Sequence, residues 1–174
     1  HLEVSELVMD NCQKGVQMAG AVSSTGLAPK LLLDESIIDY SDSATSDVNR
    51  VGVDVFSSAK AELRENVITR HGKCCGLGTV QRGGAAVSGS ATLDIVGAGG
   101  TGGVGNKICH NTTSAVSGSL PREIDNNRSG YTVPAQSNWW CNGPGGLAKG
   151  HVGLLDDANA LVNDPFPNIP APGL

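Results

Sequence analysis

Aromatic residues make up only 3% of this 174-residue chain, with two each of Trp, Tyr and Phe. Glycine is abundant by comparison, with 24 residues. With so few aromatic side chains, the core has to be built from Val, Ile, Leu and Ala in narrow layers. The composition therefore favours a thin, repetitive all-β architecture over a helical bundle.

Long apolar runs and an excess of positive charge are also missing. Runs such as Leu31 to Leu33 are three residues long, whereas a membrane-spanning helix needs about 18. The 12 basic and 17 acidic residues give a formal net charge of −5, which provides no broad attraction to nucleic acid or to an anionic membrane. We predict a soluble protein with neither partner and no membrane insertion. Because the sequence begins at His1, we expect a mature form or an excised piece.

An internal repeat of about 30 residues runs along the chain. The segments LEVSELVMDN, KLLLDESIIDY, AELRENVITRH and ATLDIVG align Val4, Leu33, Leu63 and Leu93, at spacings of 29, 30 and 30 residues. The same register aligns two more apolar sets, Val8 with Ile37 and Val67, and Met9 with Ile38 and Ile68. Each unit thus presents the same apolar positions in a strand-like pattern.

A second β-prone segment, introduced by glycine, follows three of these units. These segments are GVQM from residue 15, GVDV from residue 52 and GLGTV from residue 76. Short strands separated by Gly, Asn and Asp turns are typical of a β-solenoid, in which each coil covers the strand edges of the next. Asn66 and Asn106 occupy corresponding turns, where an Asn side chain can hydrogen-bond backbone. We predict a short asparagine ladder there.

The C-terminal part contains NKICHNTTSAV, GYTVPAQ, NWW, a Gly/Pro turn and DANALVNDPFP, in this order. This order resembles the C-terminal coils of secreted right-handed parallel β-helix repeat proteins of bacteria. In that family the last full coil ends in Asn-Trp-Trp-Gly, and the final strand ends near an Asp-Pro-aromatic pair. The matching residues are Asn138, Trp139, Trp140, Gly143, Pro144, Gly145, Asp164, Pro165 and Phe166. The chain departs from the family at Cys141, where glycine is usual.

The repeat and the resemblance together imply an all-β fold, a right-handed parallel β-helix (β-solenoid) of about five coils with a C-terminal cap. Residues 1–146 would form the coils, and residues 147–174 a capping strand and a Pro-rich tail. The first coil, from Leu2, has no evident cap. We therefore expect further coils upstream in a longer chain, or a partner, at that end.

Trp139 and Trp140 have two interpretations. As a structural cap, they would cover the open end of the stack, each indole burying on the order of 200 Å². As a carbohydrate-stacking platform, they would lie on a solvent face. We favour the cap, because a paired cap turns at least one indole inward.

The five cysteines, Cys12, Cys74, Cys75, Cys109 and Cys141, show neither CxxC nor His-paired spacing, so disulfides are favoured over a zinc site. Cys109 and Cys141 straddle the last coil. We predict a disulfide between them that fastens the cap, worth roughly 3 to 4 kcal/mol for a loop of about 30 residues. Cys12 would pair with Cys74 or Cys75.

A Gly-rich segment, LDIVGAGGTGGVG, matches the dinucleotide-binding pattern GxGxxG at Gly97, Gly99 and Gly102. That motif requires a helix directly after the glycines. The following residues, NKICHNTTSAVSGS, are rich in β-branched and turn-forming types and lack helical apolar spacing. We predict a loop that protrudes from the stack, without a bound nucleotide.

Acidic residues gather around the inserted loop SDSATSDVN. Asp39, Asp42 and Asp47 are weak candidates for Ca²⁺ ligands, since no EF-hand or RTX-type repeat accompanies them. A solvated acidic loop without a cofactor is the favoured interpretation.

Basic residues of the next coil supply an alternative chemistry. Arg64, Arg70 and Lys73 would be the catalytic candidates of a Ca²⁺-dependent polysaccharide lyase, which removes the proton alpha to a uronate carboxylate. The competing interpretation is structural, because Asp34 and Arg64 align on adjacent coils and would form an ion pair across a strand spacing of about 4.8 Å. The scarcity of aromatic residues for a sugar-binding groove favours the structural interpretation.

Two functional hypotheses remain. The favoured one is a non-catalytic module, secreted or at the cell surface, that serves as a matrix or appendage protein and binds a glycan or self-associates at its coil ends. The alternative is a polysaccharide (polyuronate) lyase or glycoside hydrolase. Charged residues clustered on one face of consecutive coils would favour the enzyme, and charges scattered around the girth would favour the module.

Overall fold

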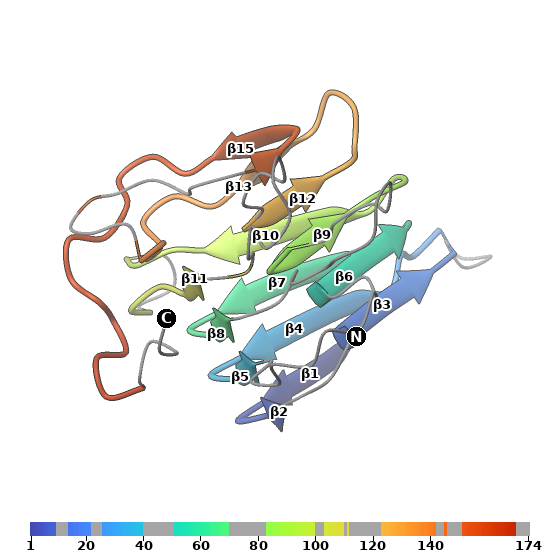
Figure 1. Ribbon diagram of the computed structural model, residues 1–174. Coiled ribbons are helices and arrows are strands. Elements are labelled where there is room, and N and C mark those ends of the chain that lie inside the picture. Colours follow the sequence, from blue (N-terminus) through green and yellow to red (C-terminus); the bar gives the residue numbers. More distant parts are fainter. Residues whose placement is uncertain are drawn as a thin grey trace, which may run out of the picture.

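The computed structural model describes residues 1–9, 14–21, 26–39, 51–69, 83–99, 103–109, 111, 123–141, 145 and 151–169. All regular secondary structure within these ranges is β-strand. The strands are parallel and form stacked sheets, and successive turns of the chain add strands to each sheet in order (Figure 1). The prediction of an all-β chain is confirmed, and the arrangement is compatible with a β-solenoid.

Sheet A has the order β1-β4-β7-β10 and sheet B the order β11-β8-β5-β2. The strands of sheet A are β1 (Leu2–Ser5), β4 (Lys30–Asp34), β7 (Lys60–Arg64) and β10 (Thr92–Val96). The strands of sheet B are β2 (Val8–Met9), β5 (Ile37–Asp39), β8 (Val67–Thr69) and β11 (Lys107–Cys109). A two-residue turn therefore separates each strand of sheet A from its successor in sheet B in the first three turns of the chain.

Sheet C has the order β14-β12-β9-β6-β3, and sheet D pairs β13 with β15. The strands of sheet C are β3 (Lys14–Gly20), β6 (Val51–Ser57), β9 (Ala85–Val87), β12 (Ile124–Asn126) and β14 (His151–Val152). The strands of sheet D are β13 (Thr132–Pro134) and β15 (Leu154–Asp156). Both strands after residue 147 thus pair with strands of the preceding part of the chain.

Tyr131 joins sheet D to sheet A. β13 lies against β10, and the Leu93 N–H donates to the Tyr131 hydroxyl (3.0 Å), which itself donates to the Leu93 carbonyl (2.7 Å). The Tyr131 hydroxyl thus pairs with both backbone groups of Leu93 in β10. These bonds connect sheet A to sheet D, where β13 follows β10 in the stack. Arg128 lies over the Tyr131 ring, 4.5 Å from its centroid.

The core lies between the sheets and consists almost wholly of aliphatic side chains. Alternation along each strand of sheet A turns one set inward, for example Leu33, Leu63 and Ile95, which are at most 1% exposed. The intervening positions face outward. Trp140 is the largest fully buried side chain of the described residues, so the scarcity of aromatic residues is met by narrow aliphatic layers, as the composition predicted.

The predicted repeat register is confirmed for the first three units. Val4 pairs with Leu33 and Leu33 with Leu63, and the Val8 and Met9 sets pair as predicted. The fourth unit is wrong by two residues, because Leu63 pairs with Ile95 and not with Leu93.

The shift arises in the connection between β8 and β9. Ile38 pairs with Ile68, 30 positions later, whereas Val55 pairs with Val87, 32 positions later. A shift of two residues keeps each side chain on the same face of the sheet, because the side-chain period of a strand is two. The alternation of apolar residues is therefore unchanged by the two extra residues, and the sequence pattern alone does not reveal them.

The third Gly-introduced segment, residues 76–80, lies outside the described ranges. Among the described strands, the partner of β6 is β9, which begins after Gly84. Gly15, Gly52 and Gly84 occupy equivalent positions. A Cβ at Gly84 would lie 2.6 Å from the Asn111 amide nitrogen, and one at Gly15 would lie 2.4 Å from the Gly52 carbonyl oxygen. Close approach of neighbouring groups therefore requires glycine in this column.

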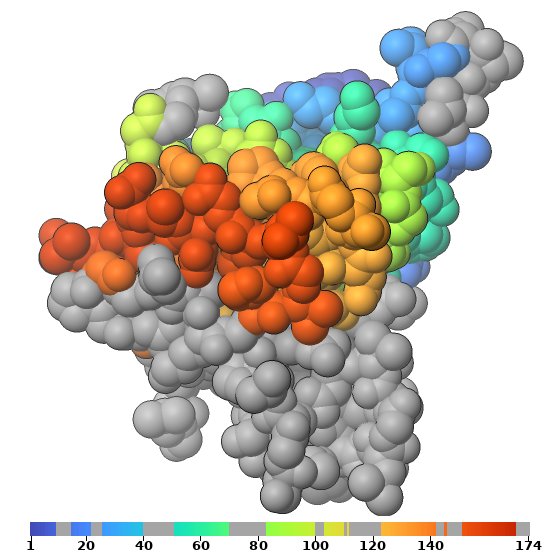
Figure 2. Space-filling model, turned by 90° about the horizontal axis from the view of Figure 1, so that it is seen from above, coloured from blue at the N-terminus to red at the C-terminus, as the bar shows by residue number. Residues whose placement is uncertain are grey.

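The two ends of the stack differ. At the N-terminal end, β1, β2 and β3 are the terminal strands of sheets A, B and C. At the other end, segments from the last part of the chain, coloured orange and red, spread over the preceding strands, with the first strands behind them (Figure 2). The C-terminal end is thus covered by the chain itself.

Candidate functional site

The outward face of sheet A carries a group of charged side chains, which we call the charged face: Lys30, Lys60, Glu62, Arg64 and Asp94. Register places them together, since Lys30 pairs with Lys60 across β4 and β7, and Glu62 with Asp94 across β7 and β10. Alternate residues of each strand share a face, so all five project on the same side. The charges are clustered on consecutive strands, which is the arrangement expected for an enzyme.

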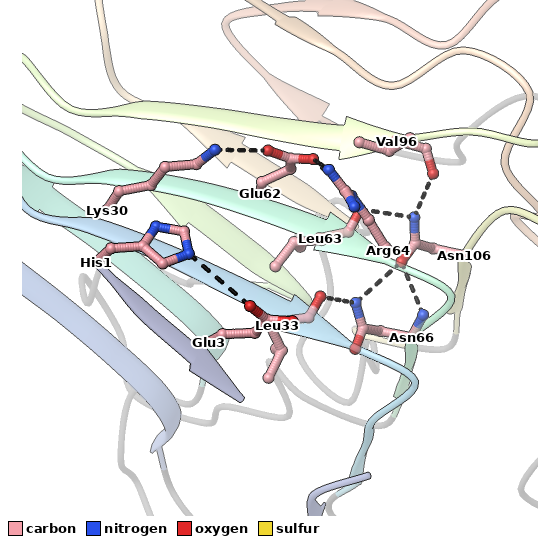
Figure 3. Close-up of polar contacts among 10 residues, drawn as sticks. All are labelled: His1, Glu3, Lys30, Leu33, Glu62, Leu63, Arg64, Asn66, Val96 and Asn106. Atoms are coloured by element: carbon pink, nitrogen blue, oxygen red, sulfur yellow. Dashed lines mark hydrogen bonds and ion pairs between the residues drawn. The ribbon is translucent and has the colours of Figure 1, made fainter. Parts of the chain in front are cut away.

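Glu62 is the centre of this face. Lys30 Nζ lies 3.1 Å from one Glu62 carboxylate oxygen, and the Arg64 guanidinium bonds the other through Nε (2.6 Å) and Nη2 (Figure 3). The Glu62 side chain is only 15% exposed. Charge-assisted hydrogen bonds to two cations hold the Glu62 carboxylate in one geometry.

The pKa values of the neighbouring carboxyls Glu62 and Asp94 are shifted in opposite directions. Burial tends to raise the pKa of Glu62, but the hydrogen bonds and charges of Arg64 and Lys30 outweigh it and lower that pKa below its ordinary value. Asp94 is exposed as a residue, yet partial burial of its carboxyl raises its pKa, and the Glu62 carboxylate raises it further. Glu62 is therefore firmly ionised, and Arg64 is held as its cationic partner.

A pocket of about 90 Å³ lies beside the charged face, where the strands of sheet A end. It is lined by Asp34, Arg64, Glu65, Val96 and three glycines of the Gly-rich loop, Gly97, Gly103 and Gly105. The register of β4 and β7 places Asp34 next to Arg64. Glu65 follows with a backbone φ of 52°, a left-handed conformation that turns the chain toward sheet B.

The predicted ion pair between Asp34 and Arg64 is wrong, although their alignment is confirmed. Arg64 binds Glu62 of its own strand instead. An arginine side chain reaches a residue two positions away on the same strand face as easily as one on the next strand, and the alignment of coils gave no means to choose.

Arg64 is the one lyase candidate that the structure describes, since Arg70 and Lys73 lie outside the described ranges. Its guanidinium is bound to the Glu62 carboxylate. Of the Ca²⁺ candidates, Asp39 accepts a hydrogen bond from Thr69 Oγ1 (2.8 Å), and Asp42 and Asp47 lie outside the described ranges. Within the described residues, no group of three or more His, Cys, Asp or Glu side chains is placed to hold a metal ion.

Asn66 and Asn106 hydrogen-bond each other in the turns between sheets A and B. Asn66 Nδ2 donates to Asn106 Oδ1 (3.2 Å), and Asn106 Nδ2 donates to Asn138 Oδ1 (3.0 Å). Each Oδ1 also accepts the backbone N–H of the preceding turn, including that of Ser36. Sequence reasoning missed Asn138 as a member, although it follows Asn106 by 32 residues, the spacing of the shifted repeat.

Trp139 extends sheet B, and Trp140 packs in the core. Trp139 forms a parallel bridge to Lys107 and is half-buried, while Trp140 is 1% exposed and belongs to the core. The disulfide predicted between Cys109 and Cys141 is confirmed, with a Cα–Cα distance of 5.5 Å. Cys12, Cys74 and Cys75 lie outside the described ranges.

Lys107 is a buried cation that sequence reasoning missed. Its side chain is 1% exposed, and its Nζ donates to Asp164 Oδ2 (2.6 Å) and to the carbonyls of Phe166 (3.3 Å) and Ile169 (3.0 Å). The tail thus binds the outward side of sheet B. The Asp-Pro-Phe motif, which supplies two of these acceptors, was visible in the sequence. Nothing in the sequence indicated that Lys107 is the donor they bind.

The Gly-rich loop is followed by β11 and not by a helix, so the dinucleotide motif lacks the helix that it requires. The described residues also contain no helix of the length and apolarity needed to cross a membrane.

No protein-family model matches this chain, and neither a curated protein nor a solved structure matches it.

Proposed function

We propose that this chain is a non-catalytic module, a right-handed parallel β-helix of about five coils, that works outside the cell and associates with a second copy through its N-terminal end. Stacked parallel sheets with the same strand order in successive turns support the fold. The disulfide between Cys109 and Cys141 supports an oxidising, extracellular setting, because such bonds are rare in the cytosol.

The observation that carries the proposal lies at the N-terminal end of the stack. β1, β2 and β3 each have one edge without a neighbouring strand among the described residues. Leu2 and Val8 at this end are 54% and 71% exposed, and Val4 and Met18 are partly buried against the core. Unpaired backbone beside exposed apolar side chains is a template for strand pairing with another chain.

The opposite end is less suited to pairing. β14 and β15 have only two and three residues, whereas β3 has seven, and β13 contains Pro134. Short strands and proline both limit strand addition. We therefore expect the N-terminal ends of two copies to meet, which gives a closed dimer with antiparallel strand contacts rather than an open fibre.

Sedimentation equilibrium over a concentration series tests the association. The terminal strands β1, β2 and β3 have four, two and seven residues. We expect contacts through such short edges to give a weak dimer, with Kd on the order of 1 μM or above. Replacing both Leu2 and Val8 by Lys should leave a monomer of 17.7 kDa, since both side chains are exposed and the fold tolerates the change.

The matched control replaces Leu154 and Val162 by Lys at the other end, where these residues are 53% and 62% exposed. This variant should dimerise like the unmodified chain. A wild-type chain that stays monomeric throughout the series, or a control variant that loses the dimer, would contradict the proposal.

The alternative of a polysaccharide lyase or hydrolase is favoured by one observation, the clustering of charges on sheet A. The engagement of Arg64 by Glu62 weighs against Arg64 as the base. If the protein released unsaturated uronate from a polyuronate in the presence of Ca²⁺, and Arg64→Ala abolished this release, the enzyme hypothesis would be favoured over the binding module.

A further inference from the structure

Two asparagines of the chain stand in the acceptor pattern for an N-linked glycan, in which a serine or threonine follows two residues after the asparagine. The triplets are Asn111-Thr112-Thr113 and Asn127-Arg128-Ser129. Exported proteins carry such glycans on surface loops. The sugar replaces one of the two hydrogens on the asparagine Nδ2 and needs open space beside that atom. The surroundings of each asparagine in the fold therefore decide whether it can carry a glycan.

Asn111 cannot carry a glycan in the folded protein. Its side chain is 0% exposed. Its Nδ2 donates to the Ile68 carbonyl (2.9 Å) and to Glu123 Oε2 (2.8 Å), so both hydrogens of this nitrogen are engaged. A sugar here would remove one of these bonds, leave a buried acceptor without its donor and require space that the core does not have.

Asn127 has the opposite surroundings. It is exposed and lies directly after β12. Its backbone N–H donates to the Val87 carbonyl (2.9 Å), which fixes the start of this turn to the preceding turn of the chain. The backbone is thus held in place while the side chain is accessible from solvent.

The residues around Asn127 leave room for a sugar. Ser129 and Gly130 of the same turn are exposed, and a Cβ at Gly130 would meet no atom within 4 Å. The register that pairs Asn126 with Val87 places Asn127 beside Ser88 of the preceding turn. The neighbours of the acceptor are therefore small.

The one bulky residue of the triplet, Arg128, turns away from this space. Its Nη1 donates to the Ala91 carbonyl (2.6 Å), and its guanidinium lies over the Tyr131 ring. The fold thus binds the middle residue of the triplet and leaves its first and third residues exposed.

We infer that Asn127, and not Asn111, accepts an N-linked glycan when this chain is exported through a pathway that holds an oligosaccharide transferase. The inference rests on the proposed function outside the cell. The donor is an oligosaccharide linked to a lipid pyrophosphate. Asn127 Nδ2 forms a bond to C1 of the first sugar, the bond from C1 to the phosphate oxygen breaks, and the lipid pyrophosphate leaves with its electrons. One amide proton passes to a base of the transferase.

The glycan would not block self-association. Asn127 follows β12, and β9 and β6 separate this strand from β3 at the N-terminal end of sheet C. The modified surface and the N-terminal end are therefore different parts of the molecule, and each can be tested without the other.

Secretion of the full chain from a eukaryotic cell line tests the inference. Peptide N-glycosidase converts a glycosylated asparagine to aspartate, so peptide mapping after this treatment identifies the modified position. We expect the conversion at Asn127 in most of the secreted chains and none at Asn111. An unmodified Asn127, or a glycan on Asn111 of the folded protein, would overturn the inference.

Variants of the triplet separate N-linked transfer from other modification. Asn127→Gln and Ser129→Ala should each abolish the glycan, and the matched variant Ser129→Thr should retain it, because threonine keeps the hydroxyl that the pattern requires. A glycan that persists in Ser129→Ala would contradict the assignment.

The variant with Lys at positions 2 and 8 should carry the glycan as the unmodified chain does, and Asn127→Gln should dimerise normally. Failure of self-association and failure of glycan transfer are therefore distinguishable.

Discussion

At the scale of single residues, Lys107 is the least expected feature of the chain. A buried ammonium costs several kcal/mol to desolvate, and only good partners offset that cost. The three acceptors of Lys107 all belong to residues 164–169. The Pro-rich tail is therefore fastened by one cation to sheet B.

The two partners of this ion pair should respond unequally to substitution. Asp164 is 26% exposed and Lys107 is 1% exposed. Asp164→Asn leaves a buried charge and should lower the free energy of unfolding by about 3 kcal/mol, whereas Lys107→Met leaves a carboxylate that water reaches and should cost about 1 kcal/mol. Urea unfolding of both variants measures the difference. A larger loss for Lys107→Met than for Asp164→Asn would contradict this account.

At the scale of elements, the asparagine ladder joins successive turns of the chain between sheets A and B. The side chain of Asn106 donates to Asn138 Oδ1 and to the carbonyls of Leu63 and Val96, and it accepts from Asn66. Every one of these groups is buried or partly buried. The ladder thus supplies hydrogen-bond partners to backbone groups that the turns themselves leave unpaired.

Asn106→Ala should therefore be costly out of proportion to its size. Several buried groups lose their partners at once, so we expect a loss of about 3 to 5 kcal/mol in the free energy of unfolding, measured by chemical denaturation. The exposed Asn127 provides the control, and Asn127→Ala should change stability by about 0.5 kcal/mol or less. A loss near 1 kcal/mol for Asn106→Ala would mean that water takes over the hydrogen bonds that Asn106 makes, and would contradict this account.

At the scale of the whole molecule, protection from solvent should follow position in the stack. Among the described strands, those in the middle, such as β7 and β8, have hydrogen-bonded neighbours on both sides, whereas β1 and β2 have a neighbour on one side. Repeat proteins open from their ends, because each unit contacts only its neighbours.

Amide hydrogen exchange at low protein concentration should reveal this gradient. We expect the amides of β1 and β2 to exchange at least about a hundredfold faster than those of β7 and β8. The C-terminal strand β15 should exchange more slowly than β1, because the tail and the disulfide hold that end. Equal protection of β1 and β7 in a monomeric sample would show that the chain opens only as a whole.

Much of the fold could be predicted because the apolar repeat has the period of a strand and recurs at nearly constant spacing. Val4, Leu33 and Leu63 are in register for this reason. The error at Leu93 came from an insertion of two residues. An insertion of even length leaves the alternation of a strand unchanged, so the apolar pattern could not reveal it. The partners of Arg64 and Lys107 could not be predicted, because an ion pair depends on side-chain reach and on where a distant segment lies.

The pocket illustrates the same division at the candidate site. Sequence reasoning singled out Arg64 and the Gly-rich loop separately, as a catalytic candidate and as a protruding loop. Their meeting with Asp34 and Glu65 depends on the stacking of β4, β7 and β10, which brings together residues from three turns of the chain. No local pattern in the sequence contains that arrangement.

Periodicity and spacing were enough to predict the all-β class, the parallel stacking of like units, the place of Asn66 and Asn106 in equivalent turns and the pairing of Cys109 with Cys141. These features are local or strictly repeated along the chain. Which charges pair, which end of the stack the chain itself covers and where the tail binds became evident only in the folded molecule. Those depend on contacts between segments that no repeat relates, so their geometry exists only once the chain has folded.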